Sequence, residues 1–230
     1  MKRELIVAID GPSGAGKSTL SKALAQKLGY TNIDTGAMYR SVALLTHRAH
    51  IAPDDAPELQ KLCRGMSLRF ERTATGERVL LNGEDVSAAI RTPEVSLLTA
   101  RVAANPVVRG EMLRLQREMG AAGGVVLEGR DIGTVVFPEA EVKFFLSATA
   151  KERGRRRFDE LRQQGVAVEL ERTIAEVEAR DAADAAREHA PLKQAEDAIA
   201  VDSTLLNIDQ VLQQMLAVIE ARRAGLDRSD

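Results

Sequence analysis

Residues 11–18 have the types and spacing of a loop that binds phosphate. They read GPSGAGKS and match the pattern GxxxxGK[ST] in full. In such a loop the glycines let backbone N–H groups turn toward a phosphate, the lysine reaches the β- and γ-phosphates, and the hydroxyl ligates Mg²⁺. We therefore assign Lys17 as a catalytic cation and Ser18 as the Mg²⁺ ligand. The residues assigned to ATP binding are Gly11, Pro12, Ser13, Gly14, Ala15, Gly16, Lys17, Ser18 and Thr19.

The segments around this loop predict the strand and helix that it needs. Residues 5–9 form a continuous apolar run, which is typical of a strand buried on both faces of a parallel sheet. Residues 17–28 predict a helix that Gly29 ends. A second strand over 30–34 and a second helix over 36–47 follow. This β-α-β-α order indicates an α/β fold.

The rest of the chain continues the α/β pattern with one interruption. Between residues 67 and 87 alternating apolar residues and the pair Asn82-Gly83 predict a small β insertion with a hairpin. Charged residues dominate 150–190, where we expect a helical hairpin that stands off the core. The other expected elements are two helices over 93–120 broken at Asn105-Pro106, strands over 125–128, 142–146 and 198–201, and a last helix over 208–223.

Composition excludes several classes of protein. The 230 residues are 44% hydrophobic and carry a net charge of -2, which does not favour binding to the phosphate backbone of nucleic acid. No run of residues approaches the length that spans a bilayer, so we expect no membrane partner. The only cysteine is Cys63, which rules out an internal disulfide and indicates a cytoplasmic protein.

Five arginines indicate a second phosphorylated substrate. A GTPase switch is not indicated, because the sequence contains neither NKxD nor DxxG. Forked N–H donors are well suited to bind phosphate. The arginines are Arg40, Arg109, Arg130, Arg180 and Arg187.

Separated motifs over essentially the whole chain resemble those of the bacterial cytidylate kinases, a branch of the nucleoside monophosphate (NMP) kinases. The motifs lie at residues 10–19, 34–40, 82–86, 128–138, 180–181, 190–192 and 202–204. The resemblance implies a P-loop NTPase fold with a five-stranded parallel sheet, a β-containing NMP-binding insert and a helical lid. It places the core at 1–34, 106–149 and 191–230, the insert at 35–105 and the lid at 150–190. The implied reaction is Mg²⁺-dependent transfer of a phosphoryl group from ATP to CMP or dCMP.

The resemblance also implies a role for individual residues. It adds Arg130 and Arg187 to Lys17 as catalytic residues. It makes Asp131 the reader of the cytosine amino group, and a carboxylate does accept from cytosine N4 while it repels uracil O4. Where the family commonly has a serine that contacts cytosine, this sequence has Ala100. The implied CMP-binding residues are Thr35, Arg40, Arg109, Arg130, Asp131, Arg180, Asp184 and Arg187.

Two other functions remain open at this point. A kinase of UMP, AMP or another small acceptor would carry the same phosphate-binding loop, and so would a non-catalytic NTP-binding module. From spacing alone, Arg180, Asp184 and Arg187 also fit a surface salt-bridge ladder on one helix face. We expect a monomer whose partners are the small molecules ATP and CMP or dCMP, with no nucleic acid and no membrane.

Overall fold

The computed structural model describes residues 4–73, 76–163, 165–187 and 190–226. The chain divides into two compact units. The first combines Met1–Asn32 with Ala122–Asp230, and the second is Ile33–Ala121. None of the helices in the described part of the chain is long and apolar enough to span a membrane.

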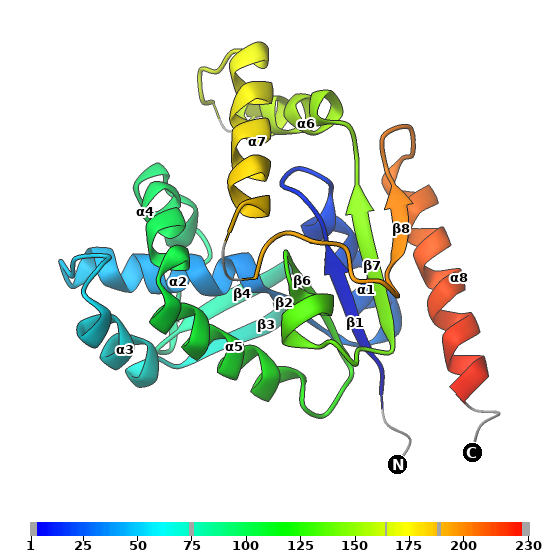
Figure 1. The fold of residues 1–230 in the computed structure, drawn as a ribbon, viewed down its shortest axis with the longest axis horizontal. Helices are drawn as coiled ribbons and strands as arrows, with labels where there is room; N and C mark the ends of the chain where they lie inside the picture. The colour runs from blue at the N-terminus through cyan, green and yellow to red at the C-terminus, as the bar shows by residue number, and fades with distance from the viewer. Residues whose placement is uncertain (1–3, 74–75, 164, 188–189, 227–230) are drawn as a thin grey trace. The chain divides into compact units, whose positions relative to one another are not determined.

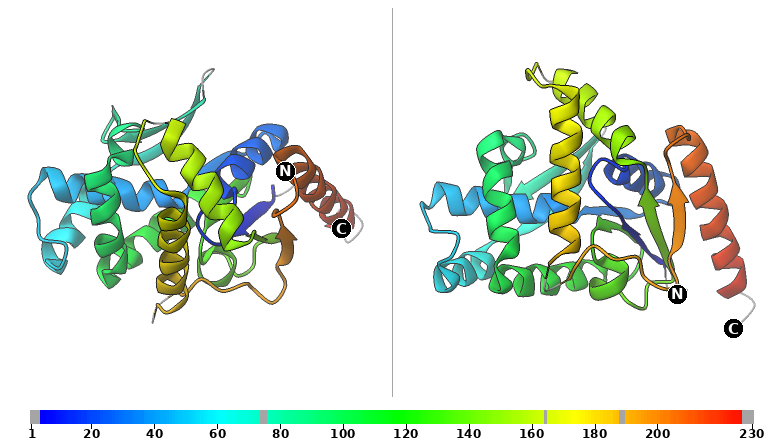
Figure 2. Two further views of the ribbon diagram at one scale, coloured as in Figure 1. Left: turned by 90° about the horizontal axis from the view of Figure 1, so that it is seen from above. Right: turned by 45° about the horizontal axis from the view of Figure 1, so that its top comes forward.

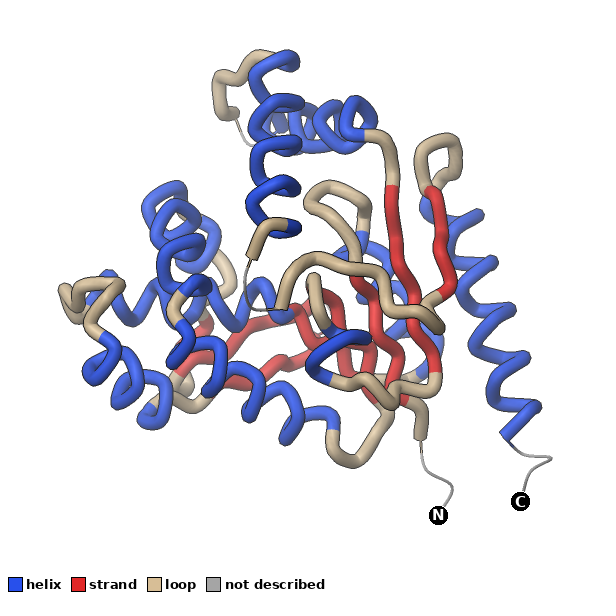
Figure 3. Tube along the Cα trace, in the orientation of Figure 1, coloured by secondary structure: helices blue, strands red, loops and turns tan. Residues whose placement is uncertain are grey.

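A five-stranded sheet forms the centre of the first unit (Figures 1 and 3). Its order is β2 (Thr31–Asp34), β6 (Val125–Gly129), β1 (Ile6–Asp10), β7 (Val142–Ser147) and β8 (Ile199–Asp202). The pairs β1–β6, β1–β7 and β7–β8 are parallel. Every residue of β1 and β6 is buried, which explains why both strands begin with an apolar run, although each carries an acidic residue near its carboxyl end. The predicted parallel α/β sheet is confirmed.

Helices α1 (Lys17–Leu28) and α8 (Ile208–Leu226) pack against one face of this sheet. Alternate residues of the first strand segment, Leu5, Val7 and Ile9, face them, because successive side chains of a strand point to opposite faces. They share one core cluster with Leu24 of α1 and Met215 of α8, which are fully buried. This core fixes the start of α1, and therefore the loop that precedes it.

The predicted helical hairpin is present in the first unit. It consists of α6 (Ala150–Gln163) and α7 (Leu170–Ala185), which lie side by side (Figures 1 and 2). The helices cross closely at Gly154, where a Cβ would come within 2.4 Å of Ile174 Cγ1. A larger residue at position 154 would therefore force the two helices apart.

The second unit contains helices and a three-stranded antiparallel sheet. The sheet is β3 (Leu68–Thr73), β4 (Gly76–Leu81) and β5 (Glu84–Asp85). The turn between β4 and β5 has Asn82 and Gly83 at φ 53 and 85, as the hairpin prediction requires. The helices are α2 (Thr35–Arg48), α3 (Ala56–Gly65), the short η1 (Ala89–Arg91), α4 (Pro93–Ala104) and α5 (Pro106–Gly120).

Helix α3 was not predicted, although its sequence signals are local. The Asp55 carboxylate accepts from the N–H of Glu58 over 3.2 Å and caps the helix, and a proline stands in its first turn. Only Leu59 and Cys63 are buried on it, so its apolar periodicity is short. A π-helical turn, η2 (Ile132–Val136), was also not expected.

The second unit extends past the end that was expected for the insert. Residues 106–120 were placed with the core, but they form α5 of the second unit. The reason is contact with α3, where Arg64 Nε donates to the buried Glu111 carboxylate over 2.7 Å. The chain leaves and re-enters the first unit at one place, since the Thr31 N–H donates to the Gly124 carbonyl over 2.9 Å.

Candidate phosphoryl-transfer site

The phosphate loop, residues 11–18, lies between β1 and α1 in the first unit. Gly11 has φ +149, and a Cβ there would lie 2.0 Å from the carbonyl oxygen of Leu146. Gly14 has φ +76, and a Cβ there would lie 3.0 Å from the Arg153 carbonyl oxygen. Both positions therefore need glycine, for the backbone conformation and for the close approach of β7 and α6.

The loop ends at the N-terminus of α1. Gly16 occupies the cap position at φ 97, and no side chain in the described part of the chain caps this helix end. The backbone N–H groups of the first turn and the helix dipole are therefore available to an anion. This arrangement is the general structural basis of phosphate binding at helix N-termini.

Lys17 is buried at the start of α1, and its Nζ donates to the Pro12 carbonyl over 2.7 Å. Burial, and next the charge of Arg130, lower the pKa of Lys17 from 10.5 to about 7, against the opposing effect of Glu128. The loop thus holds a cation in an environment that penalises its charge. A bound anion would relieve that penalty.

Ser18 contacts Glu128, a carboxylate that sequence reasoning did not assign to the site. Its hydroxyl donates to Oε1 of Glu128 in a short hydrogen bond, and Glu128 is buried. Glu128 lies in β6, directly beside Ile9 of β1 in the parallel register. An acidic residue near the carboxyl end of the strand next to the loop was a signal that could have identified it, because ligands bind at that edge of such sheets.

Asp10, the last residue of β1, holds the segment that follows β6. Its carboxylate oxygens accept from the N–H groups of Ile132 and Gly133 over 2.8 and 2.7 Å. Burial raises the pKa of Asp10 to about 6, although these two hydrogen bonds oppose the rise. The predicted base reader Asp131 immediately precedes this segment, at the N-cap position of η2. Asp10 therefore fixes the backbone next to Asp131.

The carboxylate of Asp184, a predicted CMP-binding residue, contacts two other predicted residues of the first unit. Asp184 of α7 accepts from Arg130 Nε over 2.7 Å and makes a short contact with Arg187. The Asp184 side chain is 4% exposed, against 18% for Arg130 and 31% for Arg187. Arg180 is exposed on α7, and its charge is among those that lower the pKa of Lys17. The structure thus brings Arg130, Asp184 and Arg187 into direct contact.

The other predicted CMP-binding residues lie in the second unit, on α2 and α5. The Asp34 carboxylate caps α2 by accepting from the Ala37 N–H over 2.8 Å, and Arg40 Nη2 lies 3.3 Å from it. Arg40 Nε is buried and has no hydrogen-bond partner among the described residues. Arg109 lies over the ring of Tyr39, 5.9 Å from its centroid. Thr35 is the first, buried residue of α2.

Side chains from outside the loop bind both backbone groups of Ser13, its N–H and its carbonyl. Its N–H donates to Asp181 of α7 over 3.4 Å, and its carbonyl accepts from Arg153 of α6 over 3.0 Å. Asp181 and Arg153 also pair with each other in a short contact. Sequence reasoning did not place either residue at the loop, since the contacts join positions 28 to 168 residues apart.

The sequence is similar to known proteins over nearly its whole length. The family model described as cytidylate kinase matches residues 7–221. A cytidylate kinase of Syntrophotalea carbinolica is 66% identical over 229 residues, which cover 100% of this chain and 97% of that protein. Cytidylate kinases of Geobacter sp. strain M21 and of Geobacter sulfurreducens are 60% and 58% identical, covering 97% and 96% of this chain and 96% and 95% of those proteins. The chain therefore belongs to the cytidylate kinase family.

Proposed function

We propose that this chain transfers the γ-phosphoryl group of ATP to CMP or dCMP, giving ADP and CDP or dCDP. The observation that carries the proposal is the buried Lys17 in a complete phosphate loop, with Arg130 close enough to lower its pKa. Family membership supports the same reaction. No side chain has to act as a covalent nucleophile, because phosphoryl transfer depends mainly on positioning and on stabilising charge.

The phosphate loop binds the donor. Its N–H groups and the first turn of α1 face anionic oxygens, and Lys17 contacts the β- and γ-phosphates. Once ATP is bound, the phosphates raise the pKa of Lys17 and keep it charged. The cation then spreads the negative charge that develops on the transferred group.

Ser18 and Glu128 are the residues that we propose hold Mg²⁺. Their oxygen atoms meet in the structure, and hydroxyl and carboxylate oxygens are ligands that Mg²⁺ prefers. When bound, Mg²⁺ supplies positive charge to the phosphates of ATP. Glu128 also raises the pKa of Lys17, so it helps to keep the lysine protonated.

The remaining residues implied by the family resemblance bind the acceptor in this proposal. We propose that Arg40, Arg130 and Arg187 bind and neutralise phosphate, which the buried, unpaired Nε of Arg40 supports. Asp131 and Arg109 bind the cytosine base, with the Asp131 carboxylate accepting from N4. Thr35 contacts CMP at the start of α2, and Arg180 and Asp184 contact the ribose. Asp184 can accept a hydroxyl while it pairs with two arginines, because a carboxylate has about four acceptor sites.

The helical hairpin of α6 and α7 acts as the lid in this proposal, within residues 150–190, and residues 35–105 act as the NMP-binding insert. Water must be excluded during transfer, since an exposed γ-phosphate would be hydrolysed. We propose that the enzyme acts as a monomer. The buried free thiol of Cys63, whose pKa burial raises to about 11, supports a cytoplasmic location.

Release of ADP with CMP, dCMP, UMP, AMP and GMP as acceptors tests the proposal. We expect turnover with CMP and dCMP, and little with the other three. Fast turnover with UMP or AMP would assign another acceptor. ATP binding without acceptor-dependent turnover would assign a nucleotide-binding module instead.

A further inference from the structure

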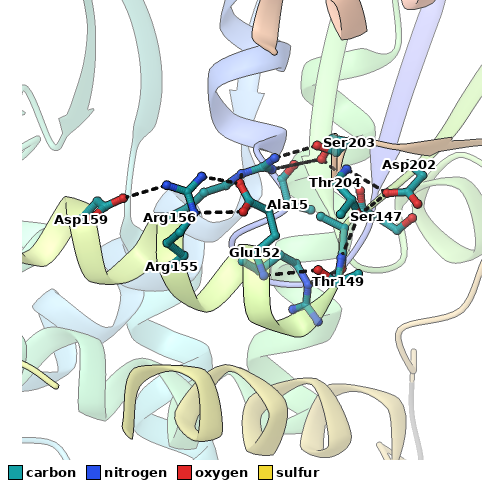
Figure 4. Close-up of polar contacts among 12 residues, drawn as sticks. Ala15, Ser147, Thr149, Glu152, Arg155, Arg156, Asp159, Asp202, Ser203 and Thr204 are labelled. Atoms are coloured by element: carbon teal, nitrogen blue, oxygen red, sulfur yellow. Dashed lines mark hydrogen bonds and ion pairs between the residues drawn. The ribbon is translucent and has the colours of Figure 1, made fainter. Parts of the chain in front are cut away.

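Two carbonyl groups of the phosphate loop are held by side chains from outside the loop. Arg153 Nη1 of α6 donates to the Ser13 carbonyl over 3.0 Å. The hydroxyl of Ser203, just after β8, shares its one proton between the Ala15 carbonyl at 3.2 Å and the Ser147 carbonyl at 3.0 Å (Figure 4). Arg156 Nη1 lies 3.5 Å from the same Ala15 oxygen. These contacts are on the backbone of the loop and not on its side chains.

Ser203 is itself fixed in place. Arg156 donates from Nη1 to the Ser203 hydroxyl over 3.0 Å and from Nη2 to the Ser203 carbonyl over 2.7 Å (Figure 4). The Ser203 N–H donates to the carbonyl of Ser147 at the end of β7 over 2.8 Å. Arg156 is held in turn by Glu152, which accepts from its Nε over 3.0 Å. The planar fork of an arginine makes this two-point contact, which a lysine cannot reproduce.

Hydrogen bonds and burial also fix the side chain of Arg153. Its side chain is 7% exposed, and its Nε donates to the Ala148 carbonyl over 2.8 Å. It also pairs with Asp181, which accepts from the Ser13 N–H. The Ser13 peptide units are therefore bound on both their N–H and carbonyl sides by α6 and α7.

Peptide planarity turns these contacts into a constraint on phosphate binding. The carbonyl of Ser13 and the N–H of Gly14 belong to one planar trans peptide and point in opposite directions. The same holds for the Ala15 carbonyl and the Gly16 N–H. A side chain that holds either carbonyl outward therefore aims the following N–H the other way. A nest of N–H groups binds an anion only when they converge.

We propose that Arg153, Arg156 and Ser203 are positioning residues that aim two N–H groups of the phosphate loop at the phosphates of ATP. Arg153 sets the Gly14 N–H, and Ser203 with Arg156 sets the Gly16 N–H. This inference rests on the proposed function, because it needs the loop to bind ATP. It gives the first turns of α6 a part in the donor site in addition to their part in the lid.

Amide NMR spectra during titration with MgADP test this pairing one residue at a time. In the wild type, the amide protons of Gly14 and Gly16 should move as MgADP binds. In Ser203→Ala and Arg156→Lys, we expect the Gly16 response at saturation to shrink while Gly14 keeps its response. Arg153→Lys should give the reverse. The dissociation constant of MgADP should rise about tenfold or more in all three, since small misplacements of such groups are costly.

Arg157→Lys is the matched control. Arg157 lies on the same helix, its side chain is 44% exposed, and it pairs with Glu160, which does not contact Arg153, Arg156 or Ser203 among the contacts found for it. It should match the wild type in both readouts. The lysine variants separate positioning from charge, because a residue that only attracts ATP electrostatically would be replaced by lysine without loss.

The outcomes distinguish this inference from the function on which it rests. In one outcome, the amide shift changes of Gly14 and Gly16 on MgADP binding are as large in all three variants as in the wild type. That result would overturn the positioning role, but it would not contradict the proposed phosphoryl transfer. A wild type in which neither amide responds to MgADP would overturn the assignment of the loop and this inference with it. Ser203→Ala removes a single oxygen atom, so it provides a folded variant if an arginine replacement lowers stability too far.

Discussion

Arg130 Nε and Asp184 Oδ2 are 2.7 Å apart and join the end of β6 to α7. Because Asp184 also contacts Arg187, one largely buried carboxylate balances two guanidinium groups. Two like charges at this spacing would repel each other without it. The carboxylate therefore offsets the repulsion between the two arginine side chains.

Asp184→Asn should lower the free energy of unfolding by about 3 kcal/mol, since removing one partner of a largely buried ion pair leaves unpaired charge. Urea denaturation measures this change. Glu176→Gln on the same helix is the control, because the Arg172–Glu176 pair has side chains 78% and 62% exposed. It should cost less than about 0.5 kcal/mol. Equal losses in the two variants would show that Asp184 contributes no more than a surface charge.

Lys17 should take up a proton when MgATP binds above neutral pH. Its pKa in the free protein is about 7, and the bound phosphates raise it. Calorimetry at about pH 8 in buffers of different ionisation enthalpy should show uptake of close to one proton. Lys17→Arg stays charged throughout and should show none. A wild type without uptake contradicts a neutral Lys17 in the free protein.

The lowered pKa of Lys17 also makes the free energy of unfolding depend on pH. The unfolded chain keeps this proton up to about pH 10.5, but the folded protein keeps it only up to about pH 7. Between these values the unfolded chain binds more protons, so the contribution of Lys17 to the free energy of unfolding increases as pH rises. Urea titrations across this range should show a smaller increase for Lys17→Met than for the wild type.

Asp131→Asn should narrow the preference for CMP over UMP. An amide can donate an N–H to uracil O4, which the carboxylate repels, and the expected change in the ratio of kcat/KM corresponds to about 1–3 kcal/mol. Steady-state kinetics with both acceptors measures it. An unchanged ratio with equal losses of activity would make Asp131 a structural residue.

Arg187→Ala should lower kcat by about 10²-fold or more, since we propose that Arg187 stabilises charge on the transferred group. The ATP dissociation constant should change by less than about tenfold, because the contact is made mainly in the reacting complex. Steady-state kinetics and a thermal melt on the same sample distinguish a role in catalysis from a surface ion pair. Normal turnover with a slightly lower Tm would reduce Arg187 to a surface ion pair.

The sequence predicted what depends on local pattern. The phosphate loop, the strands and helices that flank it, and the Asn82-Gly83 turn all follow from residues that are near neighbours in the chain. The assignment of Arg130, Asp184 and Arg187 came from family resemblance, and the structure adds that Asp184 contacts both arginines.

Contacts between distant segments could not be predicted in this way. Glu128 meets Ser18 across 110 positions, and Arg153 meets Ser13 across 140. Spacing along a helix says which residues share a face, but it does not say which backbone group that face will meet. For that reason the sequence did not show that arginines of α6 would meet the backbone of the phosphate loop.

The hydrogen bond between Thr31 and Gly124 has a consequence for how such enzymes diversify. The whole second unit begins just after Thr31 and ends just before Gly124, so it is an insertion with both ends at one point. Insertions with adjacent ends can lengthen, shorten or be exchanged at little entropic cost to the host. Recombination at these two points could therefore supply new acceptor-binding segments while the catalytic loop is inherited unchanged. We expect a chimera that exchanges residues 33–121 between relatives to keep its ATP affinity and to take its acceptor preference partly from the donor of the insert.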